Sequence, residues 1–174
     1  MSGAEAREVE ALFERHHPPL RRYLARLTGD PDLADDAAQE AFVRLLQPRV
    51  RRRLPEDGVR PWLFRVATNL VRDAARRGET RRRLGQFGRA ALSFGDPPAT
   101  PDRAAETESA RRLVDRALGA LSTKERTALL MREEGFKHRE IAAALGTTTG
   151  SVGTLLARAI EKAAGRLGAP PEEE

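Results

Sequence analysis

The sequence contains no cysteine, one tryptophan, one tyrosine and only three histidines, His16, His17 and His138. Without cysteine, the chain has no disulfide framework, no thiolate zinc site and no cysteine nucleophile. So few histidines argue against a histidine metal cage. No apolar run approaches the roughly 18 residues of a membrane span. These scarcities predict a protein with no metal, no other cofactor and no membrane insertion.

The N-terminal segment, Met1 to Arg15, is charged throughout, whereas a signal peptide needs an apolar stretch. Apolar residues make up 40% of the chain, too many for a disordered protein. A soluble, cytoplasmic protein is therefore expected. A length of 174 residues by itself favours about one domain.

The formal net charge of +5 is the sum of unlike segments. Residues 28–46 contain five acids and one base, residues 47–89 contain thirteen arginines and four acids, and residues 168–174 contain three glutamates. An arginine-rich segment of this density is typical of a surface that binds nucleic-acid phosphates. The alternative is a solvated arginine-rich surface without a partner. The separation of acidic from basic segments favours more than one kind of partner surface.

Apolar residues recur at helical spacing along nearly the whole chain, and no alternating run is long enough for a strand. The predicted fold class is therefore all-α, with two small helical domains joined by a flexible linker. Pro18 and Pro19 are expected to separate the first two helices, because the residue before proline avoids the α region. Pro61 is expected at the first turn of a later helix, after a loop. The predicted helices span residues 4–17, 19–28, 30–47, 61–77, 107–121, 123–132, 137–145 and 151–166. A capping box of Ser122 and Glu125 is expected at the start of the helix over residues 123–132.

The predicted linker covers residues 79–106, where glycine, proline, serine and arginine are frequent and apolar residues are scattered. It separates a domain over residues 1–78 from a domain over residues 107–167, and an acidic tail follows over residues 168–174. Each domain is small enough to bury only a modest core.

The predicted helix over residues 61–77 carries an aromatic ring, an amide, a carboxylate and three arginines along one side, and a run of three arginines precedes it. Aromatic rings stack on any base and arginines follow the backbone, so this side suits a single nucleic-acid strand. The alternative is an internal surface, with the tryptophan in the core and the carboxylate paired with an arginine. The residues concerned are Arg51, Arg52, Arg53, Trp62, Arg65, Asn69, Arg72, Asp73, Arg76 and Arg77.

The acids Asp35, Asp36 and Glu40 lie on the helix that Asp30 is expected to cap. Such a cluster is compatible with a metal site or with acid–base chemistry, but neither a histidine nor a second acid cluster completes one. A solvated or protein-docking face is the favoured interpretation. A carboxylate-based hydrolase is the remote alternative.

A helix-turn-helix spacing appears near the C-terminus, where Ile141-Ala142 and Leu145-Gly146 precede three threonines and a last helix. Glycine permits the sharp turn, and short polar residues at the start of the last helix can approach base edges in the major groove. The alternative is a plain corner between two helices. The candidates for DNA contact are Thr148, Thr149, Ser151, Thr154 and Arg158, together with Lys137, His138 and Arg139 on phosphates.

Three blocks of this sequence resemble conserved parts of the extracytoplasmic-function (ECF) sigma factors of bacterial RNA polymerase, in the sigma-70 family. Residues 27–30 and 34–42, LTGD and ADDAAQEAF, are similar to the second conserved domain, and residues 61–70, PWLFRVATNL, resemble its promoter-reading helix. Residues 121–164 resemble the fourth conserved domain with its helix-turn-helix. The resemblance implies a promoter-specificity subunit that has no catalytic activity of its own.

The resemblance also implies partners and residue roles. The acidic helix would bind the clamp helices of the polymerase β′ subunit through Asp35, Asp36, Gln39 and Glu40. The helix from Trp62 to Arg77 and the arginines before it would open and hold the −10 promoter element, with Asn69 and Asp73 at a flipped base. The C-terminal domain would bind the β flap and read the −35 element, and the linker would thread the polymerase channel. An anti-sigma factor is a further expected partner.

The C-terminal domain departs from the family pattern near the start of its last helix. Gly153 and Leu155 stand where the family usually has basic residues, Lys137 replaces a cap-type residue, and Glu161 adds an acid. Glycine within a helix costs about 1 kcal/mol relative to alanine. The expectation is either weak −35 contacts or contacts made mainly to backbone phosphates and through Thr154 and Arg158. The competing interpretation is a helix-turn-helix regulator that acts without polymerase, although its acidic helix would repel DNA.

Overall fold

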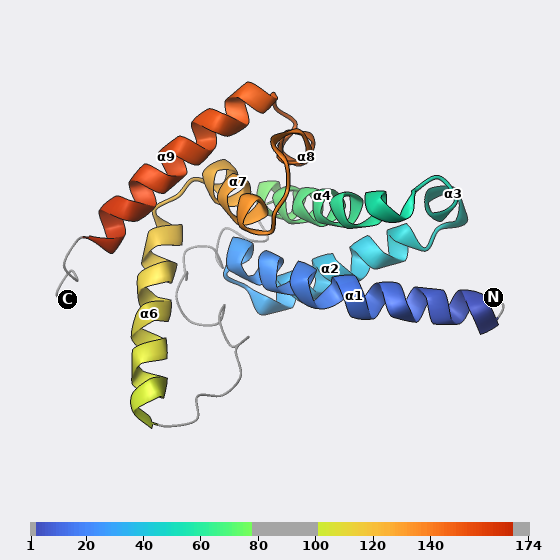
Figure 1. Ribbon diagram of the computed structural model, residues 1–174, viewed down its shortest axis with the longest axis horizontal. Coiled ribbons are helices and arrows are strands. Elements are labelled where there is room, and N and C mark those ends of the chain that lie inside the picture. The colour runs from blue at the N-terminus through green and yellow to red at the C-terminus, as the bar shows by residue number, and fades with distance from the viewer. Residues whose placement is uncertain (1–2, 78–100, 169–174) are drawn as a thin grey trace.

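The computed structural model describes residues 3–77 and 101–168, which form eight α-helices and no strand (Figure 1). The all-α fold class is thereby confirmed. None of these helices is both long and apolar enough to cross a membrane. We call the helices before residue 78 the first lobe: α1 (Gly3–Thr28), α2 (Pro31–Leu45), α3 (Pro48–Arg51) and α4 (Glu56–Arg76). The second lobe contains α6 (Pro101–Gly119), α7 (Thr123–Glu133), α8 (His138–Leu145) and α9 (Thr149–Leu167).

The first helix, α1, runs without interruption through Pro18 and Pro19, so the predicted break at these prolines is wrong. Both prolines lack the amide proton that would bond to a carbonyl one turn earlier. Leu12, Leu20 and Leu24 are nevertheless buried on the two sides of the prolines. Packing of this stripe against α2 and α4 keeps the two segments in one helix, despite the missing backbone hydrogen bonds.

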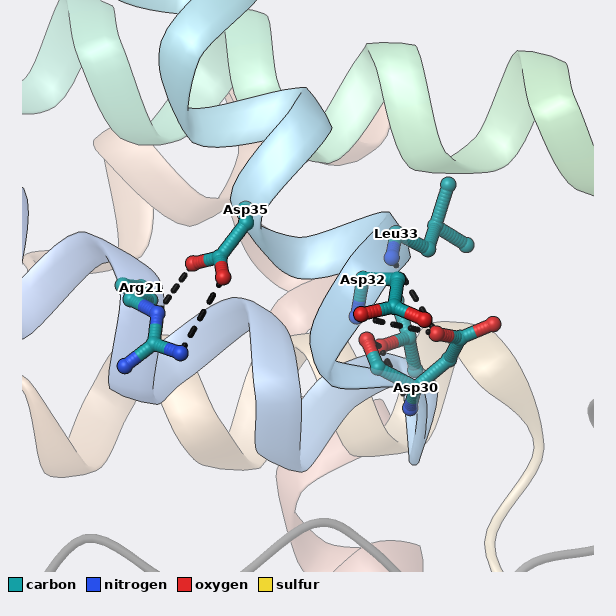
Figure 2. A network of polar contacts seen from close by, with 6 residues as sticks. Arg21, Asp30, Asp32, Leu33 and Asp35 are labelled. Atoms are coloured by element: carbon teal, nitrogen blue, oxygen red, sulfur yellow. Dashed lines mark hydrogen bonds and ion pairs between the residues drawn. The ribbon is translucent and has the colours of Figure 1, made fainter.

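The turn from α1 to α2 is built from local hydrogen bonds. Gly29 has a φ of 68°, in the left-handed region that glycine adopts easily. Asp30 Oδ1 accepts hydrogen bonds from the amides of Asp32 and Leu33, both at 3.1 Å (Figure 2). The prediction that Asp30 caps this helix is therefore confirmed.

The helix α4 begins at Glu56, five residues before the predicted start, so Pro61 lies inside the helix rather than in its first turn. Pro55 occupies the N-cap position instead. Val59 is completely buried, and its burial holds the additional N-terminal turn although Pro61 removes one backbone hydrogen bond. The predicted loop over residues 47–60 also contains the single turn α3.

The helix α6 begins at Pro101, six residues before its predicted start and inside the predicted linker. Proline suits a first helical position, because its missing amide proton has no partner there. Residues 78–100, most of the predicted linker, and residues 169–174, most of the predicted acidic tail, lie outside the described residues. The domain boundaries therefore remain predictions.

The first lobe packs α1, α2 and α4 around apolar side chains. Leu24, Leu45 and Leu63 are completely buried among these three helices. The buried hydroxyl of Tyr23 lies 2.8 Å from Thr68 Oγ1, so its polar atom has a partner inside the core. This core fixes the side of α4 that faces inward and leaves the other side to solvent.

The two lobes share one continuous core. The helix α7 contacts α1, and α8 contacts α4 (Figure 1). Phe64 of α4 and Phe136, between α7 and α8, are both buried, with ring centroids 4.8 Å apart. The sequence predicts the two lobes, but it does not predict that they pack against each other.

Candidate nucleic-acid and protein interfaces

The side of α4 predicted to bind nucleic acid is largely exposed. Arg65, Asn69, Asp73 and Arg76 all face solvent. They follow one another at intervals of three or four residues, and therefore lie on one face of the helix. The carboxylate of Asp73 lies 3.6 Å from the Arg76 guanidinium, with both side chains mostly exposed. The intrahelical pair of the alternative interpretation is thus present, but such exposed pairs contribute little to stability.

Two predicted members of this face are turned away from solvent. Trp62 is half-buried and packs against the core. Arg72 is also half-buried, and its Nη1 donates to the carbonyl oxygens of Ala144 and Leu145, each at 3.3 Å. These carbonyls lie at the C-terminal end of α8, where the helix dipole favours a cation. In this arrangement Arg72 joins the two lobes.

The predicted arginine run surrounds the end of α3. Arg51 is the last residue of that helix and pairs with Glu8 of α1. Arg52 and Arg53 are exposed, as is Arg77 at the C-cap of α4. Two of the three arginines of the run are therefore presented to solvent.

The predicted docking face on α2 is only partly on the outside. Asp36 and Gln39 are exposed. The carboxylate of Glu40 accepts a hydrogen bond of 2.8 Å from Arg44, one turn later in the helix. Asp35 differs, because its carboxylate accepts two hydrogen bonds from Arg21 of α1, one of them 3.1 Å long (Figure 2). Asp35 therefore ties α2 to α1 instead of extending the outer face.

The outer face of α2 continues into exposed apolar residues that the sequence analysis missed. Val43 is 59% exposed and Leu46 is 41% exposed, and both follow Asp36 and Gln39 at helical spacing. Phe13 of α1 is 42% exposed. Large apolar side chains grouped in solvent are typical of an interaction surface. For Val43 and Leu46, the signal in the sequence was their helical spacing from Asp36 and Gln39, which places them on the same side of the helix as these polar residues.

The acids of α2 do not assemble a metal site. Across residues 3–77 and 101–168, no three acidic or histidine side chains come close enough together to hold a cation.

The helices α8 and α9 form the predicted helix-turn-helix. Gly146 between them has a φ of 63°, and Thr148 caps α9 by accepting a hydrogen bond from the Ser151 amide at 3.2 Å. Ser151 is half-buried, and its hydroxyl lies 2.9 Å from the Thr148 hydroxyl, so it supports the cap. The other predicted contact residues are exposed, namely Lys137, His138, Arg139, Thr148, Thr149, Thr154 and Arg158.

The position of α9 is fixed by a buried carboxylate. Glu125, which is 4% exposed in the first turn of α7, accepts hydrogen bonds from Lys162 Nζ on both oxygens at 2.9 Å and from the Ser122 amide at 2.9 Å. The bond from Lys162, followed by that from Ser122, lowers the pKa of Glu125 below its ordinary value. The predicted capping box of Ser122 and Glu125 is confirmed. It also orients the Glu125 carboxylate toward the ammonium group of Lys162.

Glu125→Gln is expected to lower the free energy of unfolding by about 2 kcal/mol at neutral pH, because charged hydrogen bonds contribute roughly 1.5–3 kcal/mol. A carboxyl whose pKa is lowered by folding stabilises the protein above its unfolded pKa, near 4.3, and loses this contribution as the pH falls through the folded value. Urea unfolding from pH 7 to pH 3 measures the effect. The difference between parent and variant should shrink below about pH 4.5.

The matched control for this prediction is Glu161→Gln, which removes an exposed carboxylate from α9. A difference between parent and Glu125→Gln that stays constant down to pH 3 would contradict the assigned ion pair.

Two family models match this chain. One is described as sigma-70 region 2 and matches residues 12–82. The other is described as sigma-70, region 4 and matches residues 111–162. The first match contains α2 and α4, and the second contains α7 and α8 and most of α9.

Relatives of similar length align along most of the chain. An ECF RNA polymerase sigma factor of Mycobacterium tuberculosis, SigL, is 35% identical over 170 residues, covering 91% of this chain and 88% of the relative. The RNA polymerase sigma factor CarQ of Myxococcus xanthus is 34% identical over 166 residues, with the same coverage of 91% and 88%.

Two solved structures have a similar fold. The sigma factor RpoE from Bartonella quintana, in complex with the anti-sigma factor NepR, has a TM-score of 0.69 at 17% identity and covers 94% of this chain and 99% of its own. CnrH, in complex with the cytosolic domain of CnrY, has a TM-score of 0.63 at 26% identity and covers 95% and 91%.

Proposed function

Because this chain belongs to the ECF group of the sigma-70 family and is an RNA polymerase sigma factor, we propose how its helices divide promoter recognition. The outer face of α2 binds core polymerase, α4 binds the opened −10 element, and α8 and α9 bind the −35 element. The observation that carries this assignment is the different character of the two exposed faces. The outer face of α2 combines Asp36 with the apolar Val43 and Leu46, whereas the exposed face of α4 carries Arg65, Asn69, Asp73 and Arg76.

The α2 face suits a protein partner rather than DNA. Its acids, the exposed Asp36 and the half-exposed Glu40, repel phosphate, and the adjacent Val43 and Leu46 offer apolar surface that a protein helix can cover. The partner implied by the family is the pair of clamp helices in the β′ subunit. A polymerase helix that pairs basic with apolar side chains fits this face.

The α4 face suits a single DNA strand with extracted bases. Arg65 and Arg76 provide charge for phosphates, while Asn69 and Asp73 provide an amide and a carboxylate for a base edge. Extracting a base costs a few kcal/mol and requires a pocket that offsets this cost. Asn69 and Asp73 are the residues proposed for that pocket.

Asn69→Ala is expected to lower open-complex formation at the cognate promoter about tenfold or more, because good contacts to a base edge contribute roughly 1–3 kcal/mol. Binding to core polymerase should not change. Permanganate footprinting measures strand opening, and a gel-shift assay with core polymerase measures docking. The matched control is Gln47→Ala, which removes an exposed amide outside this face. Equal losses in both assays would contradict the role of Asn69.

The −35 contacts are expected to come from the exposed polar residues of α8 and α9, with Lys137 to Arg139 on phosphates. Lys137 is the N-cap residue of α8, and its amide donates to Glu140 at 2.7 Å, which leaves its ammonium group in solvent. A Cβ placed on Gly153 meets no atom within 4 Å. Gly153 can therefore be replaced by a residue with a side chain without a clash at Cβ.

Gly153→Lys is expected to strengthen binding of the protein to duplex DNA carrying the −35 element. Loss of the glycine stabilises α9 by roughly 0.5–1 kcal/mol, and the new cation gains a phosphate contact. Gly153→Ala is the matched control, since it supplies the helical gain alone. The salt dependence of binding should become steeper by about 0.9 in logarithmic slope for lysine but not for alanine. Identical slopes would place Gly153 away from DNA.

The experiment that tests the proposed function is run-off transcription with core polymerase on genomic fragments, including the DNA upstream of the protein's own gene. Transcripts that require both the chain and core polymerase are expected. A helix-turn-helix regulator would bind DNA without supporting initiation, and this outcome would overturn the proposal.

We propose the cytoplasm as the site of action and no catalytic activity for the chain itself, because initiation takes place on core polymerase. An anti-sigma factor is a proposed partner as well. Its support is that RpoE was solved in complex with the anti-sigma factor NepR, and that this chain has the fold of RpoE. Co-purification from cells that express the tagged chain tests for such a partner.

A further inference from the structure

The N-terminal half of α1 lies at the same end of the first lobe as α3 and the arginine run, residues 51–53 (Figure 1). Leu12 and His16 of α1 are buried in this lobe, and Glu8 precedes Leu12 by four residues. Residues four apart lie on the same side of a helix, so Glu8 is on the side of α1 that turns toward the rest of the lobe. Glu10 is exposed two residues later, on the opposite side.

Two ion pairs join this part of α1 to the segment that contains α3 and the start of α4. Glu8 accepts a hydrogen bond from Nη2 of Arg51, the last residue of α3. Arg15 lies two turns after Glu8, and its Nη1 donates to Glu56, the first residue of α4, at 3.2 Å. The side chains of Arg15 and Glu56 are 65% and 82% exposed, whereas that of Arg51 is only 30% exposed. The pair with Glu8 is therefore the more enclosed of the two, and it holds a member of the arginine run.

A carboxylate and a phosphate compete for the same donors of an arginine. The guanidinium binds either anion through its planar array of N–H groups. The donor that Arg51 gives to Glu8 cannot serve a phosphate at the same time. Arg52 and Arg53 are exposed beyond the end of α3. Neighbouring arginines of one run thus differ in what they offer to a nucleic-acid strand.

The number of arginines that reach phosphates sets the affinity for any strand, whatever its sequence. Each phosphate contact adds sequence-independent affinity and increases the salt dependence of binding. A chain that presents two arginines of the run binds nucleic acid less tightly than its arginine content suggests. Less of it is then held on unrelated DNA or RNA.

We propose that Glu8 is an internal substitute for a phosphate, which withholds Arg51 from nucleic acid and thereby lowers the sequence-independent affinity of the chain for a single strand. This inference rests on the proposed function of the arginine run in binding DNA. It goes beyond that function because it gives adjacent arginines opposite roles, and because it assigns a role to the N-terminal half of α1.

The first test compares Arg51→Gln with Arg52→Gln, which remove the same charge from adjacent positions. The probe is a fluorescein-labelled single strand of 20 thymidines, and fluorescence anisotropy gives the affinity over a range of salt concentrations. Arg52→Gln should lower the logarithmic salt slope by about 0.7, the value for one phosphate contact of a single strand. Arg51→Gln should leave the slope of the parent unchanged. Equal decreases for the two variants overturn the proposal.

The second test releases Arg51 while leaving it in place. Glu8→Gln should bind the probe about two- to fourfold more tightly than Glu10→Gln, within the range that one exposed ion pair spans. Its salt slope should be steeper by about 0.7, since one more phosphate contact forms. Glu10→Gln is the matched control, because it removes an equal charge from the opposite side of the same helix. Identical affinities and slopes for the two variants overturn the proposal.

A double variant assigns the gain to Arg51 itself. Glu8→Gln combined with Arg51→Gln should lose the additional affinity and return to the salt slope of the parent. If the gain persists without Arg51, it comes from the lost negative charge alone, and the proposal is overturned.

The same measurements separate this inference from the proposed function. A salt slope that Arg52→Gln and Arg53→Gln both leave unchanged overturns the DNA-binding role of the arginine run, and with it this inference. A slope that falls for Arg52→Gln, together with equal behaviour of Glu8→Gln and Glu10→Gln, overturns the role of Glu8 alone.

Discussion

Replacing the buried Arg126 by methionine is expected to lower the free energy of unfolding by on the order of 3 kcal/mol. Arg126 is 6% exposed and donates to the carbonyls of Leu118 at 2.9 Å, Leu121 at 3.2 Å and Leu27 at 3.2 Å. Methionine has a similar length but no donor, so three carbonyls lose their charged partner. Because the acceptors lie at the ends of α1 and α6, the loss affects both lobes.

Urea unfolding followed by circular dichroism measures this effect. A chain of this size loses roughly 2–4 °C of Tm for each kcal/mol, so a thermal scan should show a fall of about 6–12 °C. Desolvation lowers the pKa of Arg126 to about 10, so the guanidinium remains charged at neutral pH. The matched control is Arg116→Met, at an exposed position of α6. Overlapping curves for the two variants would show that the buried cation contributes no stability.

Reversing two charges on the outer face of α2 is expected to weaken binding to core polymerase about 100-fold, equivalent to roughly 2.7 kcal/mol. The double variant is Asp36→Lys with Glu40→Lys. Both side chains are on the proposed docking face, and like charges placed at an interface cost several kcal/mol. Folding should change little, since the exposed pair of Glu40 with Arg44 contributes only about 0.3–0.5 kcal/mol.

Equilibrium competition for core polymerase against a labelled parent chain measures this affinity. The control changes the same amount of charge on another surface, with Glu10→Lys and Glu14→Lys on exposed positions of α1. A second comparison uses Val43→Ala, which tests the apolar part of the face without any change of charge. If the control loses as much affinity as the α2 variant, the effect comes from net charge and the docking face lies elsewhere.

Local chemistry allowed several features of the fold to be predicted. The cap at Asp30, the capping box of Ser122 and Glu125, and the left-handed turn at Gly146 are all confirmed. Each depends on residues within about four positions of one another, and that information is present in the sequence.

The prolines show where local reasoning fails. Pro18, Pro19 and Pro61 all lie inside helices, although each removes a backbone hydrogen bond. Helix interruption at proline is a preference of a few kcal/mol, and burial of flanking side chains such as Leu20 and Val59 outweighs it. The packing partners of those side chains lie on other helices, and the residue pattern within one segment does not reveal them.

The predicted site residues divide in the same way. Helical period correctly predicted that Arg65, Asn69 and Asp73 would share an exposed face of α4. It could not predict that Asp35 and Arg72 would turn inward, because their partners are in α1 and α8. The Arg72 contact joins residues more than 70 positions apart, and no local pattern encodes such a distance.

The bonds that Arg72 and Arg126 make between the lobes end on main-chain carbonyl oxygens. A guanidinium keeps its proton throughout the physiological pH range, and a carbonyl has none to lose. These contacts are therefore insensitive to cellular acidification, unlike a switch built on histidine. A phosphate offers a guanidinium a charged acceptor, so a polyanion that reaches the half-buried Arg72 can compete with the α8 carbonyls for it. Competition by an anion, and not a change in proton concentration, is the condition to which this contact can respond.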